Sequence, residues 1–464
     1  MSIPLSRVAR MIMLALILAL AVARPAAAQT VLRDSETELL FRDISRPLIQ
    51  AAGMDPANVK IVLINDQEIN AFVAGGQIVY LQSGLITAAD NVNQVQAVVA
   101  HELGHVAGGH VIRLADGARD ATGITLATMV LGVIAMAAGA GDAGLGIMMA
   151  GQRAALGRFL AFTRAQESSA DLAGARYLSE AGISGRGSLE FFKKLQNQEF
   201  RLAIPQKDSY DRTHPLSGER IAALEEVYKK DPAWDRPPDP ELEERFQRVK
   251  AKLFGFVNPK QAVVRYPESK KSAAAHYARA YGYHVGAYPE KALSEADALL
   301  AMEPDNPFFL ELKGQILLES GRPYEAIAPL RKATELASDQ PLIASMLAHA
   351  LISTERREYQ GEAKSLLRAA VNRDNQNPFA WYQLGMIYER EGDRARAALA
   401  TAERNNLQRE PKLALASAEM AMKGIPAGTP DYLRAQDIAM VSRAELRKQD
   451  KNFDRQERRR ERTQ

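Results

Sequence analysis

The sequence predicts a mostly helical α+β domain with a small β-sheet, followed by an all-α superhelix of tandem repeats. Short β-branched and glycine-containing segments interrupt an otherwise helical pattern in the first half of the chain. A proline cluster at residues 235–240 marks a boundary. The second half repeats with a period of about 34 residues. At 464 residues the chain is too long for one core, which agrees with two domains.

Residues 1–28 have the three parts of a secretory signal peptide. Arg7 and Arg10 form a charged start, Met11–Ala23 is an apolar run, and residues 26–28 are three alanines that suit a cleavage site. We therefore expect export and cleavage near Ala28. The alternative is an uncleaved membrane anchor, but the apolar run is short for a bilayer and ends in an Arg-Pro pair.

The first domain is expected to span residues 29–234. Residues 36–51 have the apolar spacing of a helix, whereas residues 59–65 form a β-branched run typical of a strand. Within residues 70–86, the pair Gly75-Gly76 is a hairpin turn signal between two short strands. The rest of the domain is predicted to be helical, and residues 235–270 are expected to form a linker.

An almost uncharged stretch, residues 121–150, lies inside this domain and has Asp142 as its sole charge. It is long enough to contact a bilayer. However, glycine and alanine make it weakly hydrophobic, and residues 139–144 have the composition of a turn. We predict two short apolar helices that pack over the domain or dip into a membrane surface, in preference to a transmembrane span.

Residues 271–441 contain the repeats. Successive units close at Pro307, Pro341, Pro378 and Pro411, with spacings of 34, 37 and 33 residues. This period, with helix, turn, helix and closing proline, is the tetratricopeptide signature, whose units stack into a superhelix with a concave groove. Because the third unit has extra residues around 354–360, a nonspecific helical bundle is the alternative. Residues 442–464 are expected to be a charged tail.

Composition limits the partners and the chemistry of the protein. A net charge of +3 with 25% charged residues is ordinary for a soluble surface and gives no indication of nucleic-acid binding. The chain has no cysteine, so an exported protein of this sequence forms no disulfides. Any metal site must therefore use histidine and carboxylate ligands.

The segment His101-Glu102-Leu103-Gly104-His105 is the strongest chemical signal in the sequence. On a helix, residues four apart share one face, so the two histidines present their imidazoles to one point. A zinc ion fits there, and Glu102 can take a proton from water activated by the metal. Because so short a motif also occurs by chance, the prediction requires a third protein ligand.

The predicted third ligand is Glu167, which lies in a second helical segment. A histidine at the spacing of some other zinc helices would fall at Val111, and His110 points away from the face of the two ligands, so we interpret His110 as a supporting residue. Asp171, one turn beyond Glu167, can accept a hydrogen bond from an imidazole N–H and fix its tautomer. The alternative, an exposed acidic pair at i and i+4, would place two like charges together without benefit.

A further element is Thr213-His214-Pro-Leu-Ser-Gly-Glu-Arg220. His214 either contributes to the site or only marks a helix N-terminus that Ser217 caps, and residue types and spacing leave both interpretations open. The remaining histidines are in the repeats and are expected to pack or lie on the surface: His276, His284 and His349.

Three motifs in this order resemble the M48 family of gluzincin metallopeptidases: the segment at 101–105, Glu167-Ser-Ser-Ala-Asp171, and the segment at 213–220. With its N-terminal signal and C-terminal repeats, the chain is similar over nearly its whole length to periplasmic members of that family. The resemblance implies a gluzincin-type domain in which His101, His105 and Glu167 bind zinc. It also implies that Glu102 is the general base.

The resemblance bears on residues whose roles spacing leaves open. In periplasmic members the matching histidine can take the fourth zinc position and hold the enzyme latent, and we carry this role to His214 as a hypothesis. A fourth protein ligand would displace the attacking water and close the site. Arg220 matches the family's arginine. Asn70-Ala71-Phe72 resembles the family's edge strand beside the cleft, where an extended substrate can add as another strand.

The resemblance implies a periplasmic zinc endopeptidase that degrades misfolded or stalled outer-membrane proteins. The repeats would dock unfolded clients or the barrel-assembly machinery. From composition, residues 121–150 are expected to make peripheral membrane contact at most, and nucleic acid is not an expected partner. The alternatives are a chaperone or scaffold with a largely latent protease site and a membrane-embedded peptidase of the same family. Histidine and carboxylate ligands also accept divalent ions other than zinc.

Overall fold

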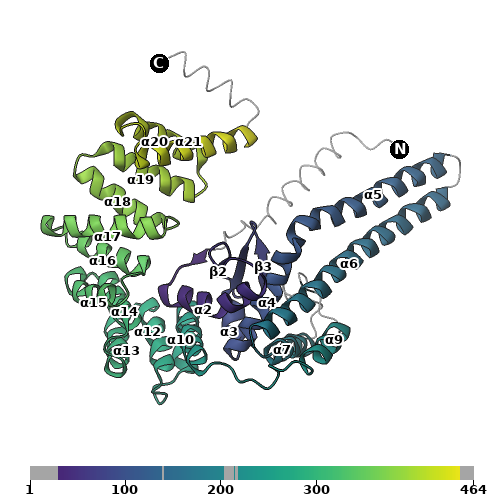
Figure 1. Ribbon diagram of the computed structural model, residues 1–464, viewed down its shortest axis with the longest axis horizontal. Helices are drawn as coiled ribbons and strands as arrows, with labels where there is room; N and C mark the ends of the chain where they lie inside the picture. The colour runs from purple at the N-terminus through teal and green to yellow at the C-terminus, as the bar shows by residue number, and fades with distance from the viewer. Residues whose placement is uncertain (1–29, 138–140, 203–213, 215–217, 450–464) are drawn as a thin grey trace, which may run out of the picture.

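The computed structural model describes the following parts of the chain: residues 30–137, 141–202, 214 and 218–449. The predicted signal peptide at 1–28 and the end of the predicted tail at 450–464 lie outside the described residues. Figure 1 shows a mixed α/β domain, a long helical pair that projects from it, and an arc of helices on the opposite side.

Four short strands form one mixed sheet: β1 (Val31–Leu32), β2 (Lys60–Ile64), β3 (Ala71–Ala74) and β4 (Ile78–Gln82). Their order is β1-β2-β4-β3, with β2 parallel to β4 and both outer strands antiparallel to their neighbours. The predicted hairpin is confirmed, because β3 and β4 pair across Gly75 and Gly76, which both have positive φ. β3 is therefore an edge strand with a strand partner on one side only.

The helices of the first domain pack on this sheet or extend from it: α2 (Ser35–Ala51), α3 (Ser83–Ala88), α4 (Val92–Gly108), α5 (His110–Ala137), α6 (Gly141–Glu180), α7 (Arg186–Leu202) and α9 (Gly218–Tyr228). α4 is the central helix, and its Val95, Val99 and Leu103 are fully buried. Asn91 caps its start through the Gln94 amide at 3.0 Å. This packing gives the side chains of α4 a rigid base.

The two apolar helices predicted within residues 121–150 are longer than expected, and they do not pack over the domain; the alternative, contact with a membrane surface, stays a prediction. Residues 121–150 form the outer ends of α5 and α6, two long antiparallel helices that extend away from the domain (Figure 1). Gly117 lies against Phe162 and Gly151 against Thr128, so small residues allow the two helices to pair closely. The glycines that suggest a turn at 139–144 are partly helical, because α6 already begins at Gly141.

The predicted linker at residues 235–270 is largely helical. α10 (Pro240–Val257) begins inside the proline cluster, and proline is well tolerated in the first turn of a helix. Phe246 and Val249 of α10 are completely buried in the core that α2 and α4 also form. α11 (Pro259–Arg265) follows directly. The proline cluster therefore starts a helix that connects the two domains.

The repeat prediction is confirmed, because antiparallel helix pairs stack into the arc of Figure 1. The helices are α12 (Ala273–Val285), α13 (Pro289–Met302), α14 (Pro307–Glu319), α15 (Pro323–Leu336), α16 (Pro341–Ser353), α17 (Gln360–Arg373), α18 (Pro378–Arg390), α19 (Arg394–Leu407), α20 (Pro411–Gly424) and α21 (Pro430–Gln449). The extra residues of the third unit form a short 3-10 helix, Arg357–Tyr359. The predicted tail from residue 442 begins inside α21, where Ser442 is buried.

A buried charge cluster joins the two domains. Lys252 of α10 lies 2.6 Å from Asp34 and 2.8 Å from Glu36, and the hydroxyl of Tyr277 in α12 donates a hydrogen bond to Glu36 at 2.9 Å. Glu311 of α14 is buried nearby. A buried charge that loses its partner is costly, so these contacts hold the repeat array in one orientation against the first domain.

Candidate metal centre

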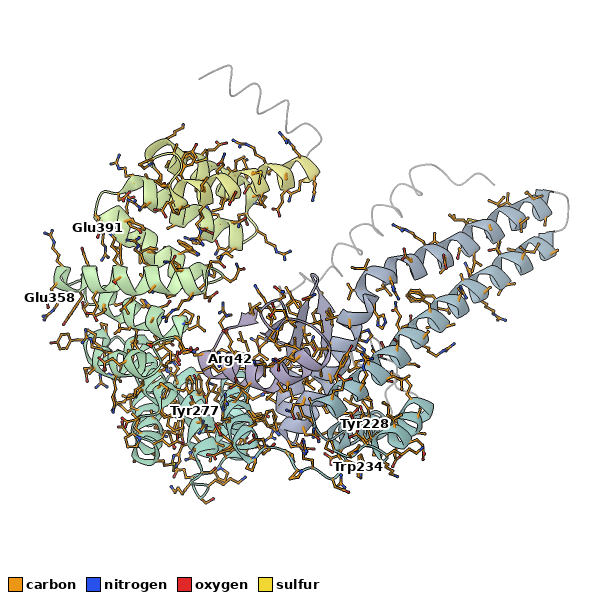
Figure 2. All side chains as sticks on the ribbon, in the orientation of Figure 1. Arg42, Tyr228, Trp234, Tyr277, Glu358 and Glu391 are labelled. Atoms are coloured by element: carbon orange, nitrogen blue, oxygen red, sulfur yellow. The ribbon has the colours of Figure 1, made fainter. Side chains whose placement is uncertain are left out.

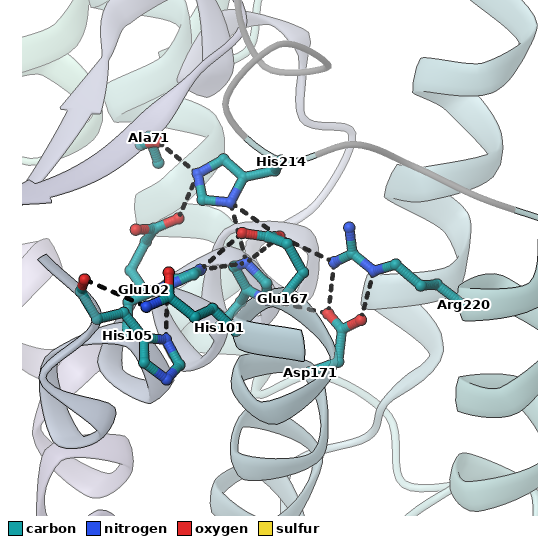
Figure 3. A network of polar contacts seen from close by, with 10 residues as sticks. Ala71, His101, Glu102, His105, Glu167, Asp171, His214 and Arg220 are labelled. Atoms are coloured by element: carbon teal, nitrogen blue, oxygen red, sulfur yellow. Dashed lines mark hydrogen bonds and ion pairs between the residues drawn. The ribbon is translucent and has the colours of Figure 1, made fainter. Parts of the chain in front are cut away.

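The predicted site residues converge where α4 packs on α6 (Figure 3). Glycines bring the two helices together: a methyl group on Gly104 would lie 2.7 Å from the carbonyl oxygen of Ala170, and one on Gly174 would lie 3.1 Å from the backbone of Ala100. This close approach brings the Glu167 side chain of α6 onto the histidines of α4. Gly109 ends α4 with a φ of 61°, a left-handed conformation that suits glycine.

Four side chains direct potential ligand atoms toward one point: His101, His105, Glu167 and His214. The Nε2 atoms of His101 and His105 are 3.1 Å apart, and the Glu167 carboxylate lies 3.5 Å and 3.3 Å from them. Nδ1 of His214 lies 3.2 Å from His101 Nε2 and 3.2 Å from Glu167 Oε2. All four side chains are buried, so the structure brings these predicted residues together in one enclosed cluster.

The donor set fits a tetrahedral zinc ion. Zinc bonds to nitrogen or oxygen of about 2.0–2.1 Å place neighbouring donors of a tetrahedron about 3.3–3.4 Å apart. The contacts between these side chains are 3.1 to 3.5 Å long, with Glu167 using Oε1 toward His105 and Oε2 toward His101 and His214. The four potential ligand atoms all lie within 4.8 Å of one another, so small shifts bring them to tetrahedral spacing. Three imidazoles and one carboxylate are also ligand types that zinc accepts.

Polar neighbours orient the two histidines of α4. Nδ1 of His101 faces Oδ1 of Asp171 at 3.0 Å, which directs Nε2 toward the cluster. Nδ1 of His105 lies 2.9 Å from Nδ1 of His110, the first residue of α5. Burial and the neighbouring His105 lower the pKa of His110 to about 4, so His110 is neutral and can accept a hydrogen bond from His105. The supporting position predicted for His110 agrees with this contact.

Arg220 and Asp171 form a buried two-point ion pair. Nε and Nη2 of Arg220 donate to the two carboxylate oxygens of Asp171 at 2.7 Å and 2.9 Å. Nη2 of Arg220 also lies 3.2 Å from Glu167. The alternative of an exposed acidic pair is therefore wrong, because Glu167 and Asp171 are only 3% and 6% exposed and share one arginine.

The electrostatics of the cluster favour a positive charge at its centre. Burial acts to lower the pKa of His101, but hydrogen bonds with Asp171 and Glu167 raise it to about 10. Burial acts to raise the pKa of Glu167, but its contacts with the three histidines hold that pKa well below the usual range. The carboxylates that favour a proton on His101 would also favour a bound cation.

Glu102 lies beside the cluster and is completely buried. Neither of its carboxylate oxygens has a hydrogen-bond partner among the described residues, and Oε1 lies 3.5 Å from Nε2 of His214. A buried carboxylate without hydrogen bonds is costly and rare in folded proteins. Glu102 is thus available to exchange a proton with a small molecule in the cluster.

His214 also contacts the edge of the sheet. Its Nε2 lies 3.3 Å from the carbonyl oxygen of Ala71 in β3. The carbonyl of Asn70 accepts a hydrogen bond from the Gln82 amide of β4, and hydrogen-bonding directions alternate along a strand. The carbonyl of Ala71 therefore faces the free edge of β3, and His214 covers it.

The strand predicted to lie beside the cleft contacts the cluster through its main chain. Asn70 is buried, the ring of Phe72 stacks on Tyr80 with centroids 5.1 Å apart, and the carbonyl of Ala71, between them, contacts His214. The sequence could have indicated Ala71. The Gly75-Gly76 turn sets which carbonyls of β3 pair with β4, and the alternate carbonyl, that of Ala71, then faces the free edge. The repeat histidines make packing or surface contacts with their neighbours: His276 with Glu295, His284 with Glu319, and His349 with Phe379.

The chain is similar in sequence to known metallopeptidases. The profile of peptidase family M48 matches residues 8–228. A beta-barrel assembly-enhancing protease of Yersinia pestis is 28% identical over 74% of this chain and 70% of its own length, and metalloprotease LoiP of Escherichia coli K12 is 31% identical over 40% and 69%. The chain spans 64% of a second beta-barrel assembly-enhancing protease, from Escherichia coli K12. Among solved structures, the TPR protein YrrB shares 22% identity and a TM-score of 0.31 over 38% of this chain and 91% of its own.

Proposed function

The chain belongs to peptidase family M48, a family of metalloproteases, and we propose that it is a zinc-dependent endopeptidase of the periplasm that acts on misfolded or stalled outer-membrane proteins. The observation that carries this proposal is the convergence of His101, His105 and Glu167 around one point, with the buried carboxylate of Glu102 beside it. The names of two relatives, which refer to β-barrel assembly, support the choice of client. The predicted signal peptide supports the location.

In this proposal His101, His105 and Glu167 hold the ion, and Glu102 moves the proton. A zinc ion there would act as a Lewis acid that polarises the peptide carbonyl and lowers the pKa of water. Glu102 accepts a proton from the attacking water and returns it to the nitrogen of the leaving amine. Asp171 and His110 keep the two imidazoles in the tautomer that directs Nε2 to the ion.

His214 is proposed to keep the site closed. As a fourth ligand it would occupy the position that water needs, and it also lies 3.5 Å from Glu102. Its contact with the carbonyl of Ala71 covers the main-chain group that an extended substrate would use to add to β3. Recognition through main-chain hydrogen bonds would give weak sequence specificity and a preference for unfolded segments.

The test compares purified full-length variants for metal content and for hydrolysis of unfolded casein and of an unfolded outer-membrane barrel protein. Glu102→Gln should keep one zinc ion per chain and lose at least about 100-fold in kcat. Glu180→Gln, at the exposed end of α6, is the matched control and should keep full activity. Zinc absent from the wild type, or full activity in Glu102→Gln, would contradict the proposal.

The closed arrangement of His214 also favours a second candidate, a chaperone or scaffold for outer-membrane protein assembly with a largely latent protease site. His214→Ala should accelerate casein hydrolysis if latency is regulated, with His349→Ala as the control. If Glu102→Gln supports the assembly of barrel proteins as well as the wild type does, scaffolding is the main role, with the repeats as the docking surface for clients or for the barrel-assembly machinery.

A further inference from the structure

The outer halves of α5 and α6 expose large apolar side chains. Val130 and Ile134 of α5 are each 59% exposed, and Leu145 and Met149 of α6 are 55% and 60% exposed. Figure 2 shows the side chains of this pair projecting into open space, away from the rest of the chain. Within the described residues, one helix is long and apolar enough to cross a membrane, His110–Ala135, and only 6% of its most apolar part is buried.

The exposed apolar residues surround the helix, which indicates lipid in preference to a protein partner. At about 100° per residue, the exposed side chains from Leu126 to Ile134 cover roughly 200° of the α5 surface, and the remaining stripe faces α6. A protein partner would bury one face of the pair, whereas acyl chains can surround it. A helix that is apolar on most sides needs a core or a membrane around it, and no other described segment covers this one.

We propose that the outer part of the α5–α6 pair inserts into one leaflet of an anionic membrane. From Gly141, where α6 begins, to Arg153, the first basic residue of α6, is 12 residues, or about 18 Å at 1.5 Å per residue. One leaflet of a hydrocarbon core of about 30 Å is about 15 Å deep, so the apolar part of α6 reaches about as deep as one leaflet, with its base at the headgroups, and is too short to span the bilayer.

Charge marks the boundary of the inserted part. Arg153 and Arg158 are exposed on α6 where its apolar end finishes, at the level where they would meet anionic headgroups. Asp142 is the one acidic residue beyond them, and its burial opposes insertion. Because at least six large apolar side chains enter with it, burial of apolar surface outweighs this single carboxylate.

Insertion would fix the distance between the metal centre and the membrane surface. α6 runs without interruption from the inserted part to Glu167, which lies 14 residues beyond Arg153, or about 21 Å along the helix. The metal centre would therefore lie about 20 Å from the membrane surface, where it could meet unfolded segments of proteins that emerge from the membrane. This inference concerns the position of the enzyme and is independent of its proposed catalytic role.

Flotation of the purified mature protein with vesicles tests the inference. Vesicles of phosphatidylcholine and phosphatidylglycerol at a ratio of 3:1 should bind the protein, and pure phosphatidylcholine should bind it more weakly. Val130→Ser/Ile134→Ser/Leu145→Ser should weaken binding at least about 100-fold. The matched control, Leu413→Ser/Leu433→Ser/Met440→Ser, changes equally exposed apolar residues in α20 and α21 and should bind as the wild type does.

Charge variants and depth measurements separate insertion from adhesion. Arg153→Gln/Arg158→Gln should weaken binding to the anionic vesicles about 10-fold or more, while Asp142→Asn should strengthen it. The chain has no cysteine, so a fluorophore on Ile134→Cys and one on Leu156→Cys report depth through brominated lipids. The label at 134 should be quenched by deep bromines and the label at 156 only by shallow ones.

Three results would overturn the inference: no binding to either vesicle, equal binding of the hairpin triple variant and the wild type, or equal depth of the two labels. Self-association or capture of an unfolded barrel protein through the same residues, without vesicle binding, would also overturn it. Casein hydrolysis by the hairpin triple variant should stay at the wild-type level, so failure of the membrane inference and failure of the proposed peptidase function give different results.

Discussion

Gly104→Ala should weaken metal binding without changing a ligand. The new methyl group would lie 2.7 Å from the carbonyl oxygen of Ala170 and 2.9 Å from its Cα, both of them backbone atoms that cannot rotate away. Ordinary contacts begin at 3.4 Å, so α6 must retreat from α4 by up to about 0.7 Å, the difference between 3.4 Å and 2.7 Å. Glu167 precedes Ala170 by one turn of the same helix and retreats with it.

The size of this shift sets the expected effect. Metal sites tolerate deviations of about 0.2 Å in ligand distances, so a retreat of several tenths of an ångström is too large to absorb. We expect the metal affinity to fall about 10–100-fold, as it does when a supporting residue of a metal site is lost. We also expect the free energy of unfolding to fall by about 1–3 kcal/mol, the usual cost of overpacking.

Competition with a chelator measures the metal affinity, and thermal unfolding of the metal-free protein measures the stability. Gly174→Ala should give a smaller effect, because its methyl group meets backbone at 3.1 Å. Gly157→Ala is a control in α6, because open space surrounds Gly157. It should keep the metal affinity of the wild type and raise the free energy of unfolding by about 0.5–1 kcal/mol. A Gly104→Ala variant with the metal affinity and stability of the wild type would refute this account of the α4–α6 contact.

Two further predictions follow from buried charges. Asp171→Asn removes the two-point carboxylate partner of Arg220, which keeps Glu167 at 3.2 Å, and should lower the free energy of unfolding by up to about 3 kcal/mol in thermal unfolding, whereas the exposed control Asp116→Asn should have little effect. Burial, with neighbouring carboxylates, raises the pKa of Glu311 to about 8, so the folded state holds a proton there that the unfolded state releases above about pH 4.5. The free energy of unfolding should therefore fall as pH rises from about 5 to about 8, and Glu311→Gln should remove that part of the fall. If the free energy of unfolding of Glu311→Gln depends on pH as that of the wild type does, the prediction is wrong.

Local patterns predicted the elements whose signals are local. Gly75 and Gly76 specify a turn wherever they occur between strands, and four-residue spacing places His101 and His105 on one face of any helix. The convergence of Glu167 on these histidines could be proposed from chemistry, but not measured, because it depends on the packing of glycines between two helices.

Sequence and structure differ where the outcome depends on what surrounds a segment. Glycines in residues 139–144 favour a turn between two helices; residues 138–140, between α5 and α6, lie outside the described residues, whereas residues 141–144 already belong to α6, which pairs with α5. The prolines at 235–240 suggest a linker, but they precede a helix whose Phe246 enters the first core. The composition of a segment does not show what packs beside it. Here α5 packs beside the start of α6, and α2 and α4 pack around α10.

The two contacts of His214 imply that the site selects substrates by length. In the proposed mechanism, a substrate uses the carbonyl of Ala71 and the water position beside Glu102; His214 contacts both, so closure and substrate binding would exclude each other. If the closed form is favoured 99 to 1, opening costs about 2.7 kcal/mol, equal to about two or three net hydrogen bonds. A long unfolded segment can supply these along β3, whereas a short peptide cannot. His214→Ala should therefore accelerate hydrolysis of a short peptide more than that of an unfolded protein, and equal acceleration of both would show that opening is independent of the edge strand.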